Sequence, residues 1–345
     1  MNLKMLSEHL KLSQTTVSRA LNGYPEVSEK TRERVQKVAQ ELNYSPNARA
    51  KGLATGHAHV IGHVIPVSTQ HEMVNPVFGD FIAGAGSAYS AAGYEMMISL
   101  VDDQSQEKMY RDICARRNVD GIIVHGPTMD DPRIALLTEL KMPFVVHGRA
   151  SNIDIPYSWL DTNNSRAFRR ATEFLLDLGH KRIALMNGLE FMDYAFRRRE
   201  AYHGALTARG LPLDPALMCS KEMTESNGFL SALEMLKLEA PPTAFLTSSM
   251  ITALGVRRAI ESVGLVIGRD VSIITHDDDL GYLKNGHDVP IFTATRSSVR
   301  EAGIRAGELL LDLIRDPSAG PLHEVIEAEL IIGTSTGPAP RGTNP

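Results

Sequence analysis

Polar side chains recur along a short segment near the start of the chain, LSQTTVSRALNG at residues 12–23. Gln14 and Ser18 are four residues apart, as are Thr15 and Arg19, so in a helix both pairs lie on one side. Amides, hydroxyls and guanidinium groups form hydrogen bonds with base edges in the major groove of DNA, and an arginine offers two donors to guanine. The spacing therefore predicts a helix that contacts bases with Gln14, Thr15 and Arg19.

Three short amphipathic helices within residues 1–56 would position these side chains. Asn2, Ser13 and Ser28 are residue types that cap helix N-termini, and each precedes apolar residues at helical spacing. The expected inward faces are Leu3, Leu6 and Leu10, then Val17, Ala20 and Leu21, then Val35, Val38, Ala39 and Leu42. Three helices of this length predict a compact helix-turn-helix head, in which the second helix enters the major groove.

The charge of the chain is divided unevenly between this head and the rest. Residues 1–56 hold nine Lys or Arg and five Glu, a net charge of +4, whereas the whole chain has −5. A basic head on an acidic body indicates that only the head binds a polyanion. A helical interaction domain without a DNA partner is the alternative.

The segment at residues 46–55 is a candidate hinge. Pro46 favours a helix start, and Gly52 lies inside the following NARAKGLA. An isolated helix this short is marginal in water, so we expect it to order only when something pairs with it. Leu53 lies within this segment, and from its own sequence context it could be a plain linker residue.

Composition and length place the whole chain among globular proteins. A length of 345 residues is compatible with two or three domains. A composition of 43% hydrophobic and 22% charged residues is that of a globular protein with a sizeable core. There is no apolar run of about 18 residues, and the start MNLKMLSEHLKL has no signal core. We therefore expect a cytoplasmic protein with no membrane partner and no cofactor.

From Val60 onward, short apolar runs alternate with helical stretches, as in VIGHVIP, YEMMISLV, VDGIIVH and PFVVHG. This alternation is typical of an α/β fold with doubly wound parallel sheets. A similar unit of helix, glycine and strand recurs at AAGYEMMI and LGHKRIAL, which predicts two lobes. The tail at 337–345 is expected to be disordered.

Ligands of open parallel sheets bind beyond the carboxyl ends of the strands, which in a two-lobed body means the cleft. Polar and aromatic residues follow several predicted strands, and they suit a polar small molecule such as a sugar. Trp159, the only tryptophan, could stack on a sugar or could be packed in a core or interface. In the consecutive arginines 197–199, we expect most of the run to be solvated.

Enzyme functions have weak support in this sequence. HDDD at 276–279 lacks the spacing that would bring several ligands to one metal, since adjacent strand residues point to opposite faces. AGAGSAY at 83–89 falls inside a predicted helix rather than at a strand-to-helix turn, and it lacks a third glycine. A secreted sugar-binding protein is the stronger alternative for the body, but it predicts an export signal and no DNA-binding head.

The head resembles the lactose/galactose repressor family of bacterial transcription factors. The resemblance covers LSQTTVSRALNG, VSEKTRERV, ELNYSPNARAKGLATG and a following IG in order, although Met5 and Lys11 depart from the family pattern. It implies a dimeric regulator, usually a repressor, that binds pseudo-palindromic double-stranded operator DNA. The implied DNA contacts are Asn2, Ser13, Gln14, Thr15, Thr16, Ser18, Arg19, Asn22, Ser28, Tyr44, Asn47, Ala50 and Leu53, the last as the residue that wedges between base steps.

The same resemblance implies a periplasmic-binding-protein-like body at 60–336 for ligand binding and dimerisation, with a chain that crosses between lobes three times. Lobe one would comprise about 60–161 and 292–318, and lobe two about 162–290 and 321–336. The predicted effector contacts are Thr69, Asn75, Phe78, Arg149, Asp161, Tyr194, Arg198, Met223, Ser249 and Asp277. The segment LSQTTVSRALNGYPEV further resembles regulators of α-glucoside uptake, which implies a glucose-containing disaccharide as effector.

Overall fold

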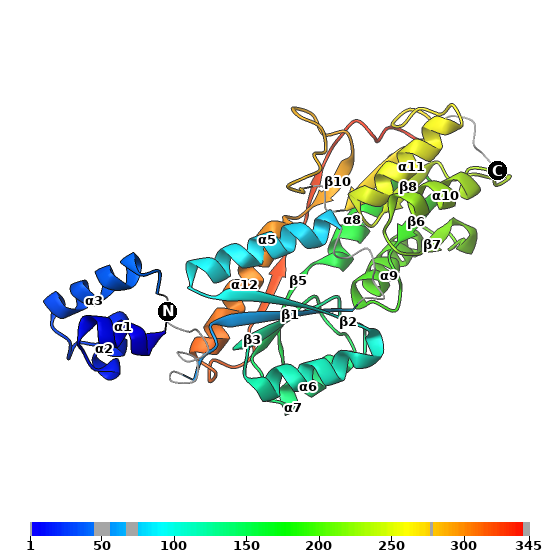
Figure 1. Ribbon diagram of the computed structural model, residues 1–345. Helices are drawn as coiled ribbons and strands as arrows, with labels where there is room; N and C mark the ends of the chain where they lie inside the picture. Colours follow the sequence, from blue (N-terminus) through cyan, green and yellow to red (C-terminus); the bar gives the residue numbers. More distant parts are fainter. Residues whose placement is uncertain (1, 45–55, 67–74, 277–278, 341–345) are drawn as a thin grey trace. The chain divides into compact units, whose positions relative to one another are not determined.

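The computed structural model describes residues 2–44, 56–66, 75–276 and 279–340 (Figure 1). The chain divides into two compact units, one up to His59 and one from Val60 onward. In the described residues, no helix is long and apolar enough to cross a membrane.

The first unit is the predicted three-helix head. Its helices are α1 (Leu3–Leu10), α2 (Gln14–Leu21) and α3 (Glu29–Glu41). The side chains of Asn2 and Ser13 cap α1 and α2 by accepting hydrogen bonds from the backbone N–H of Met5 (2.9 Å) and Thr16 (3.0 Å). Ser28 is the N-cap residue of α3, as predicted, but its hydroxyl bonds the hydroxyl of Thr31 and makes no capping bond to a backbone N–H. The shared core consists of Leu6, Leu10, Val17, Ala20, Val27, Val35 and Ala39.

The turn between α1 and α2 is strained at one residue. Lys11 ends α1 with φ of 55° and ψ of 42°, the left-handed conformation in which a Cβ crowds the following carbonyl oxygen. Its backbone N–H still donates to the carbonyl of Glu8, and the next N–H, of Leu12, donates to that of Ser7. The turn therefore keeps its geometry with lysine present, at a cost of about 1 kcal/mol relative to glycine.

The second unit has two six-stranded sheets, one in each lobe. Lobe one has the order β11-β5-β4-β3-β1-β2 and lobe two the order β12-β10-β9-β8-β6-β7. All neighbours are parallel except β10 and β12, which are antiparallel. The strands of lobe one are β1 (Val60–Pro66), β2 (Glu95–Val101), β3 (Gly121–His125), β4 (Phe144–His147), β5 (Ser158–Thr162) and β11 (His323–Ile326). Those of lobe two are β6 (Ile183–Asn187), β7 (Met218–Ser220), β8 (Ala244–Thr247), β9 (Ser272–His276), β10 (Thr293–Arg296) and β12 (Glu329–Ile331).

Helices cover both faces of each sheet, as the doubly wound prediction requires (Figure 1). In lobe one, α5 (Pro76–Ala91) and α12 (Val299–Arg315) cover one face, and α6 (Gln106–Arg116) and α7 (Pro132–Glu139) the other. In lobe two, α8 (Asn164–Asp177) and α9 (Asp193–Ala208) lie opposite α10 (Glu225–Met235) and α11 (Met250–Ser262). Two short 3-10 turns, η2 (Asp103–Ser105) and η3 (Pro215–Leu217), complete the elements described. The segment AGAGSAY lies within α5.

Two of the predicted lobe boundaries are wrong. The segment from 292 was assigned to lobe one, but β10 pairs with β9 and belongs to the sheet of lobe two. The segment from 321 was assigned to lobe two, but β11 pairs with β5 in lobe one. The chain therefore passes from lobe two to lobe one after β10 and not before it. Its last passage, from lobe one to lobe two, follows β11.

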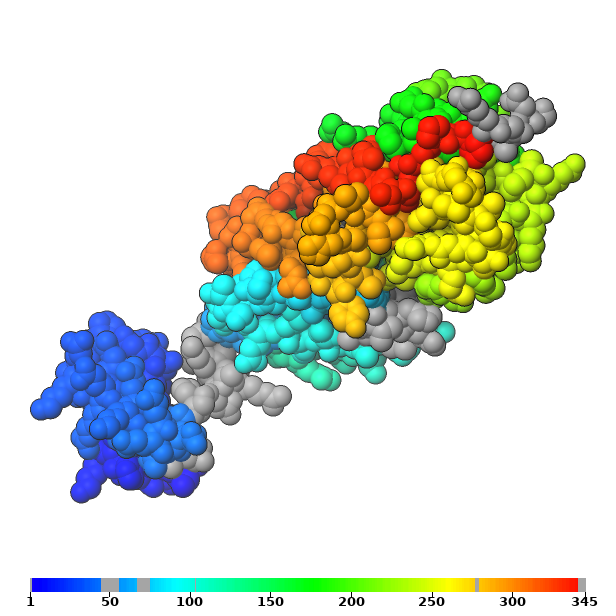
Figure 2. All heavy atoms as spheres, turned by 90° about the horizontal axis from the view of Figure 1, so that it is seen from above, coloured from blue at the N-terminus to red at the C-terminus, as the bar shows by residue number. Residues whose placement is uncertain are grey.

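The loop between β9 and β10 anchors lobe two to lobe one. Leu280 is fully buried in the core of lobe one, and the backbone N–H of Gly281 donates to the carboxylate of Asp80 on α5. The guanidinium of Arg300 donates to the same carboxylate (2.7 Å). In Figure 2 this loop, coloured gold, lies against the cyan segment that contains α5. A Cβ at Gly281 would lie 2.6 Å from that carboxylate, so a larger residue here would displace the Asp80 side chain.

The prediction of a disordered tail from 337 is wrong for its first residues. The carbonyl of Gly337 lies 3.1 Å from Nε2 of His180, and the backbone N–H of Ala339 donates to the carbonyl of Leu178 (2.9 Å). These bonds fix residues 337–340 on lobe two, while 341–345 lie outside the described residues.

Candidate functional site

The outer face of α2 carries the side chains predicted to contact DNA bases. Gln14, Thr15 and Arg19 are exposed, while Thr16 and Ser18 are half-buried beside them. The amide of Asn22 donates to the carbonyl of Ser18 (2.9 Å), so it closes the end of α2. Of the other predicted contacts, Asn2 is exposed and Tyr44 half-buried against the core, whereas Asn47, Ala50 and Leu53 lie outside the described residues.

A cleft of about 750 Å³ lies between the lobes, at the carboxyl ends of β1, β3, β6 and β7. Three predicted effector contacts line it, namely Asn75 at the start of α5, Tyr194 on α9 and Met223 after β7. The ring of Phe78 meets that of His125, which lines the cleft, edge to face at 5.2 Å. Thr69 and Asp277 lie outside the described residues.

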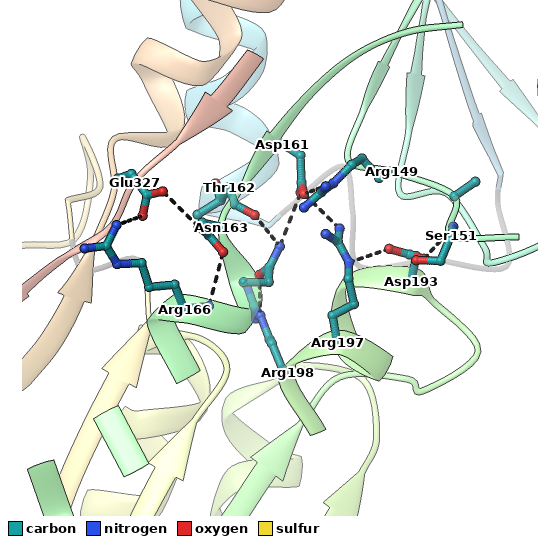
Figure 3. A network of polar contacts seen from close by, with 12 residues as sticks. Arg149, Ser151, Asp161, Thr162, Asn163, Arg166, Asp193, Arg197, Arg198 and Glu327 are labelled. Atoms are coloured by element: carbon teal, nitrogen blue, oxygen red, sulfur yellow. Dashed lines mark hydrogen bonds and ion pairs between the residues drawn. The ribbon is translucent and has the colours of Figure 1, made fainter. Parts of the chain in front are cut away.

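Arg149 and Asp161 belong to an ion-pair network that joins the lobes (Figure 3). The carboxylate of Asp161, on β5 of lobe one, accepts from Arg149 and from Arg197 of lobe two, both at 2.8 Å. Arg197 also pairs with Asp193 at 2.6 Å, and Asp193 in turn accepts from the backbone N–H of Ser151 in lobe one (2.8 Å). Two carboxylates and two guanidiniums thus hold the lobes together at one edge of the cleft.

Arg198 is buried in the structure, with an exposed fraction of 5%. Its Nε donates to the side-chain oxygen of Asn164 (2.7 Å) and its Nη1 to the carbonyl of Ser248 (3.0 Å). Its guanidinium carbon lies 4.9 Å from the ring centre of Phe168 and 4.8 Å from that of Tyr194. Asn164 also donates to Asp161 (3.3 Å), so Arg198 is connected through one side chain to the network that joins the lobes.

The expectation that most of the run 197–199 is solvated is wrong. The side chain of Arg197 is only 13% exposed because it bridges Asp161 and Asp193, and Arg199 is 34% exposed beside Glu190 and Glu200. Asp161 of lobe one covers Arg197, and Asn164 and the carbonyl of Ser248 cover Arg198; helical spacing does not reveal these tertiary partners.

Ser249 and Trp159 are occupied by contacts within the protein. The hydroxyl of Ser249 caps α11 by accepting from the backbone N–H of Thr252 (3.2 Å), and the residue is buried. The Trp159 ring stacks on His323 at 4.7 Å, and the guanidinium carbon of Arg149 lies 4.8 Å from its centre. Among the alternatives for Trp159, these contacts support packing within the protein rather than an open platform for a sugar.

Two family models match this chain and together cover both units. Residues 11–47 match the model described as bacterial regulatory proteins, lacI family. Residues 58–333 match the model described as periplasmic binding proteins and sugar binding domain of LacI family. The chain belongs to the LacI family. It is accordingly a DNA-binding transcriptional regulator with a sugar-binding domain, and members of this family are regulators rather than enzymes.

Relatives and solved structures of the LacI family agree with this assignment over nearly the whole chain. The HTH-type transcriptional regulator AglR of Rhizobium meliloti is 44% identical over 98% of this chain and 95% of its own. The lac repressor dimer bound to operator and the anti-inducer ONPF has a TM-score of 0.84 at 25% identity, over 98% of this chain and 99% of that one. The transcriptional regulator CelR in complex with cellobiose has a TM-score of 0.71 at 26% identity, over 97% and 99%.

Sequence reasoning missed several residues that line the cleft of this LacI-family protein. Phe191 follows β6 directly, so the strand-end argument that selected Tyr194 could have found it. Lys221 and Glu222 follow β7, which is only three residues long and gives little sequence signal. Gln104, Gln106, Glu107, Tyr110 and Arg111 come from η2 and α6, which a search of strand ends does not include.

Buried histidines lie beneath the cleft in lobe one. His63 Nδ1 and His125 Nε2 are 2.8 Å apart, and the hydroxyl of Tyr89 lies 3.2 Å from His63 Nε2. Burial lowers the pKa of His63 to about 3 and that of His147 to about 4, and it holds the pKa of His125 well below its ordinary value. All three imidazoles are therefore neutral at pH 7, which lets His63 and His125 share a single proton between ring nitrogens.

This burial predicts a loss of stability in mild acid. The folded-state pKa of His63 lies below its unfolded value, so between pH 6.5 and 3 the unfolded chain binds more protons and the free energy of unfolding falls as the pH falls. From pH 7 to 5 we expect His63 alone to account for about 2 kcal/mol. Urea unfolding at several pH values measures how the free energy of unfolding depends on pH. This dependence should be shallower in His63→Gln than in the wild type, and unchanged in His203→Gln, where the histidine is exposed. Equal slopes in the wild type and His63→Gln would contradict the prediction.

Proposed function

We propose that this LacI-family chain is a dimeric repressor of an operon for the uptake and breakdown of a sugar, with an α-glucoside as its effector. The observation that carries the proposal is the presence, in one chain, of an exposed polar face on α2 and a cleft of about 750 Å³ between two lobes that match a sugar-binding domain. The similarity to AglR over nearly the whole chain supports the choice of an α-glucoside.

The chemistry of the cleft suits a sugar. Carboxylates and guanidiniums form charge-assisted hydrogen bonds with hydroxyl groups, each worth about 1.5–3 kcal/mol. The cleft is lined by Glu222, Lys221 and Thr224 of lobe two and by Gln106 and Thr128 of lobe one, which together offer both donors and acceptors. In our proposal Tyr194 and Asn75 contact the effector directly, with Thr69, Phe78, Met223 and Asp277 around it.

The effector would act through the relative position of the lobes. The lobes are joined at the edge of the cleft by the ion pairs of Arg197 with Asp161 and Asp193. A sugar that binds both walls of the cleft would either weaken these ion pairs or strengthen them. A ligand shifts a conformational equilibrium only by its differential affinity for the two states. The proposal therefore requires the sugar to bind one arrangement of the lobes more tightly than the other.

The hinge at 46–55 would carry this change to the operator. Its residues lie outside the described part of the chain, and their role is proposed from the sequence and from family membership. Asn47 and Ala50 would contact DNA, and Leu53 would insert between base steps of a bent operator. Since the hinge helices of a dimer are stable only when paired on DNA, a small change in their separation would remove most of that stabilisation. This proposal also places the protein in the bacterial cytoplasm, where the operator is.

An operator-release assay tests the proposal. Double-stranded DNA that the full chain prefers would be selected from a randomised pool, and its binding followed by fluorescence anisotropy while a panel of carbohydrates is added. We expect pseudo-palindromic DNA to be selected and at least one α-glucoside to change its affinity by about fivefold or more. Selection of no common sequence, or an affinity that no sugar in the panel alters, would refute it.

A further inference from the structure

Lys11 has a left-handed backbone conformation in the turn that leads into α2. Its φ is 55° and its ψ is 42°, values that glycine adopts freely but that crowd the Cβ of any other residue. Such conformations persist only where the surrounding structure holds them, and they gather at functional sites. Since the backbone of this turn favours glycine, the presence of lysine must be explained by its side chain.

The turn around Lys11 is held from two sides. On one side, the backbone N–H of Lys11 donates to carbonyl groups in the last turn of α1. On the other side, Nη2 of Arg34 on α3 donates to the carbonyl of Leu10, the residue just before Lys11 (3.2 Å). Because α1 and α3 both fix this backbone, the left-handed conformation persists, and the direction in which the lysine side chain leaves the turn is fixed as well.

The side chain of Lys11 is exposed, and within the described residues its ammonium group forms no hydrogen bond or ion pair. Lys11 lies two residues before Ser13, which caps α2, so it precedes the end of the helix that enters the major groove. Phosphate groups border that groove, and a helix N-terminus itself attracts them. The charge of a lysine lies at the end of a flexible four-carbon stem, which suits it to reach a phosphate from the turn.

We propose that Lys11 contacts a phosphate group of the operator beside the bases that α2 contacts, and that the head keeps a strained turn because of this contact. The residue then lowers the stability of the head and raises its affinity for DNA. This role belongs to operator binding, so it does not depend on which ligand fills the cleft. The alternative is a structural role, in which the lysine stabilises the carbonyl end of α1.

The salt dependence of operator binding tests the proposal, with the full chain and its selected DNA. In Lys11→Gly the contact is lost from both heads of a dimer, so the slope of log affinity against log salt concentration should become shallower by about two. Between about 50 and 200 mM salt, the wild type should accordingly lose about tenfold more affinity than the variant does. Lys11→Arg keeps the charge and should restore the wild-type slope.

Hydrogen exchange of the head amides, measured in the same full-length proteins, separates this role from the structural one. Relief of the strained turn should make amide exchange in α1, α2 and α3 about fivefold slower in Lys11→Gly. Lys11→Asn, whose side chain is uncharged and tolerates the left-handed conformation, should lose operator affinity as Lys11→Gly does. Faster exchange in Lys11→Gly, or an unchanged salt slope, would overturn the proposal.

The matched control is Lys141→Gly in the second unit. Lys141 is also exposed and left-handed, with φ of 53° just after α7, so this substitution relieves the same strain and removes the same charge. It should leave the operator affinity and the salt slope as they are in the wild type. A slope that becomes shallower by the same amount in Lys141→Gly would show an effect of net charge alone and would contradict a contact at Lys11.

Discussion

Replacement of Arg198 by alanine is expected to weaken effector binding by about 100-fold or more while operator affinity in the absence of effector stays within twofold. The guanidinium bonds Asn164 and Ser248 and lies beside Tyr194, so its loss disturbs the wall of the cleft and the side chain connected to Asp161. A 100-fold loss corresponds to about 2.7 kcal/mol, which we attribute to displacement of the Tyr194 ring and the Asn164 side chain that Arg198 holds in place. Calorimetry with the effector and anisotropy with selected DNA measure the two affinities.

Two further variants make this result specific. Arg198→Lys keeps the charge but cannot reproduce two donors in a fixed plane, so it should recover only a small part of the affinity. Arg170→Ala, at an exposed position on α8, should bind effector as the wild type does. Effector affinity within threefold of the wild type in Arg198→Ala would move the effector site away from this residue.

Replacement of Arg19 by alanine is expected to have the largest effect on DNA recognition. The side chain is exposed on α2 and would donate two hydrogen bonds to a guanine, an interaction worth about 1–3 kcal/mol in each half-site. A selection from randomised operators should therefore show relaxed preference at one position of each half-site. The preferred operator, with two half-sites, should lose about 2–6 kcal/mol, which is about 30-fold or more in affinity.

The exposed Lys37 on α3 provides the comparison for Arg19. Lys37→Ala removes one positive charge of the head at another exposed position, and it should leave the base preference unchanged whatever it does to overall affinity. If Arg19→Ala weakens binding to every sequence equally, its contact is with phosphate, and the assignment of α2 as the base-contacting helix loses its main support.

Local features of this protein could be predicted from the sequence because they depend on residues a few positions apart. The caps at Asn2 and Ser13 and the exposed face of Gln14, Thr15 and Arg19 follow from helical spacing alone. The two largely parallel sheets also followed from alternating apolar runs, except for the antiparallel β12. Ser28 also stands at its predicted N-cap position, but its hydroxyl bonds only the hydroxyl of Thr31.

Features that depend on partners distant in sequence could not be predicted in this way. The crossings at β10 and β11 are fixed by pairing with β9 and β5, and the two strands are only four residues long. Arg197 is buried by carboxylates from β5 and from its own helix, which a run of three arginines does not reveal. Which side chains face the cleft, Phe191 among them, depends on how the two lobes are placed, and only the folded chain shows this.

The central claim is that a sugar in the cleft and operator DNA at the head change each other's affinity. The direct test measures operator affinity with and without saturating effector, and effector affinity with and without saturating operator, on the same full chain. Thermodynamic linkage requires one factor for both, and we expect it to lie between about 5-fold and 150-fold. If operator affinity is the same with the cleft filled and empty, the two sites are independent and the account is wrong.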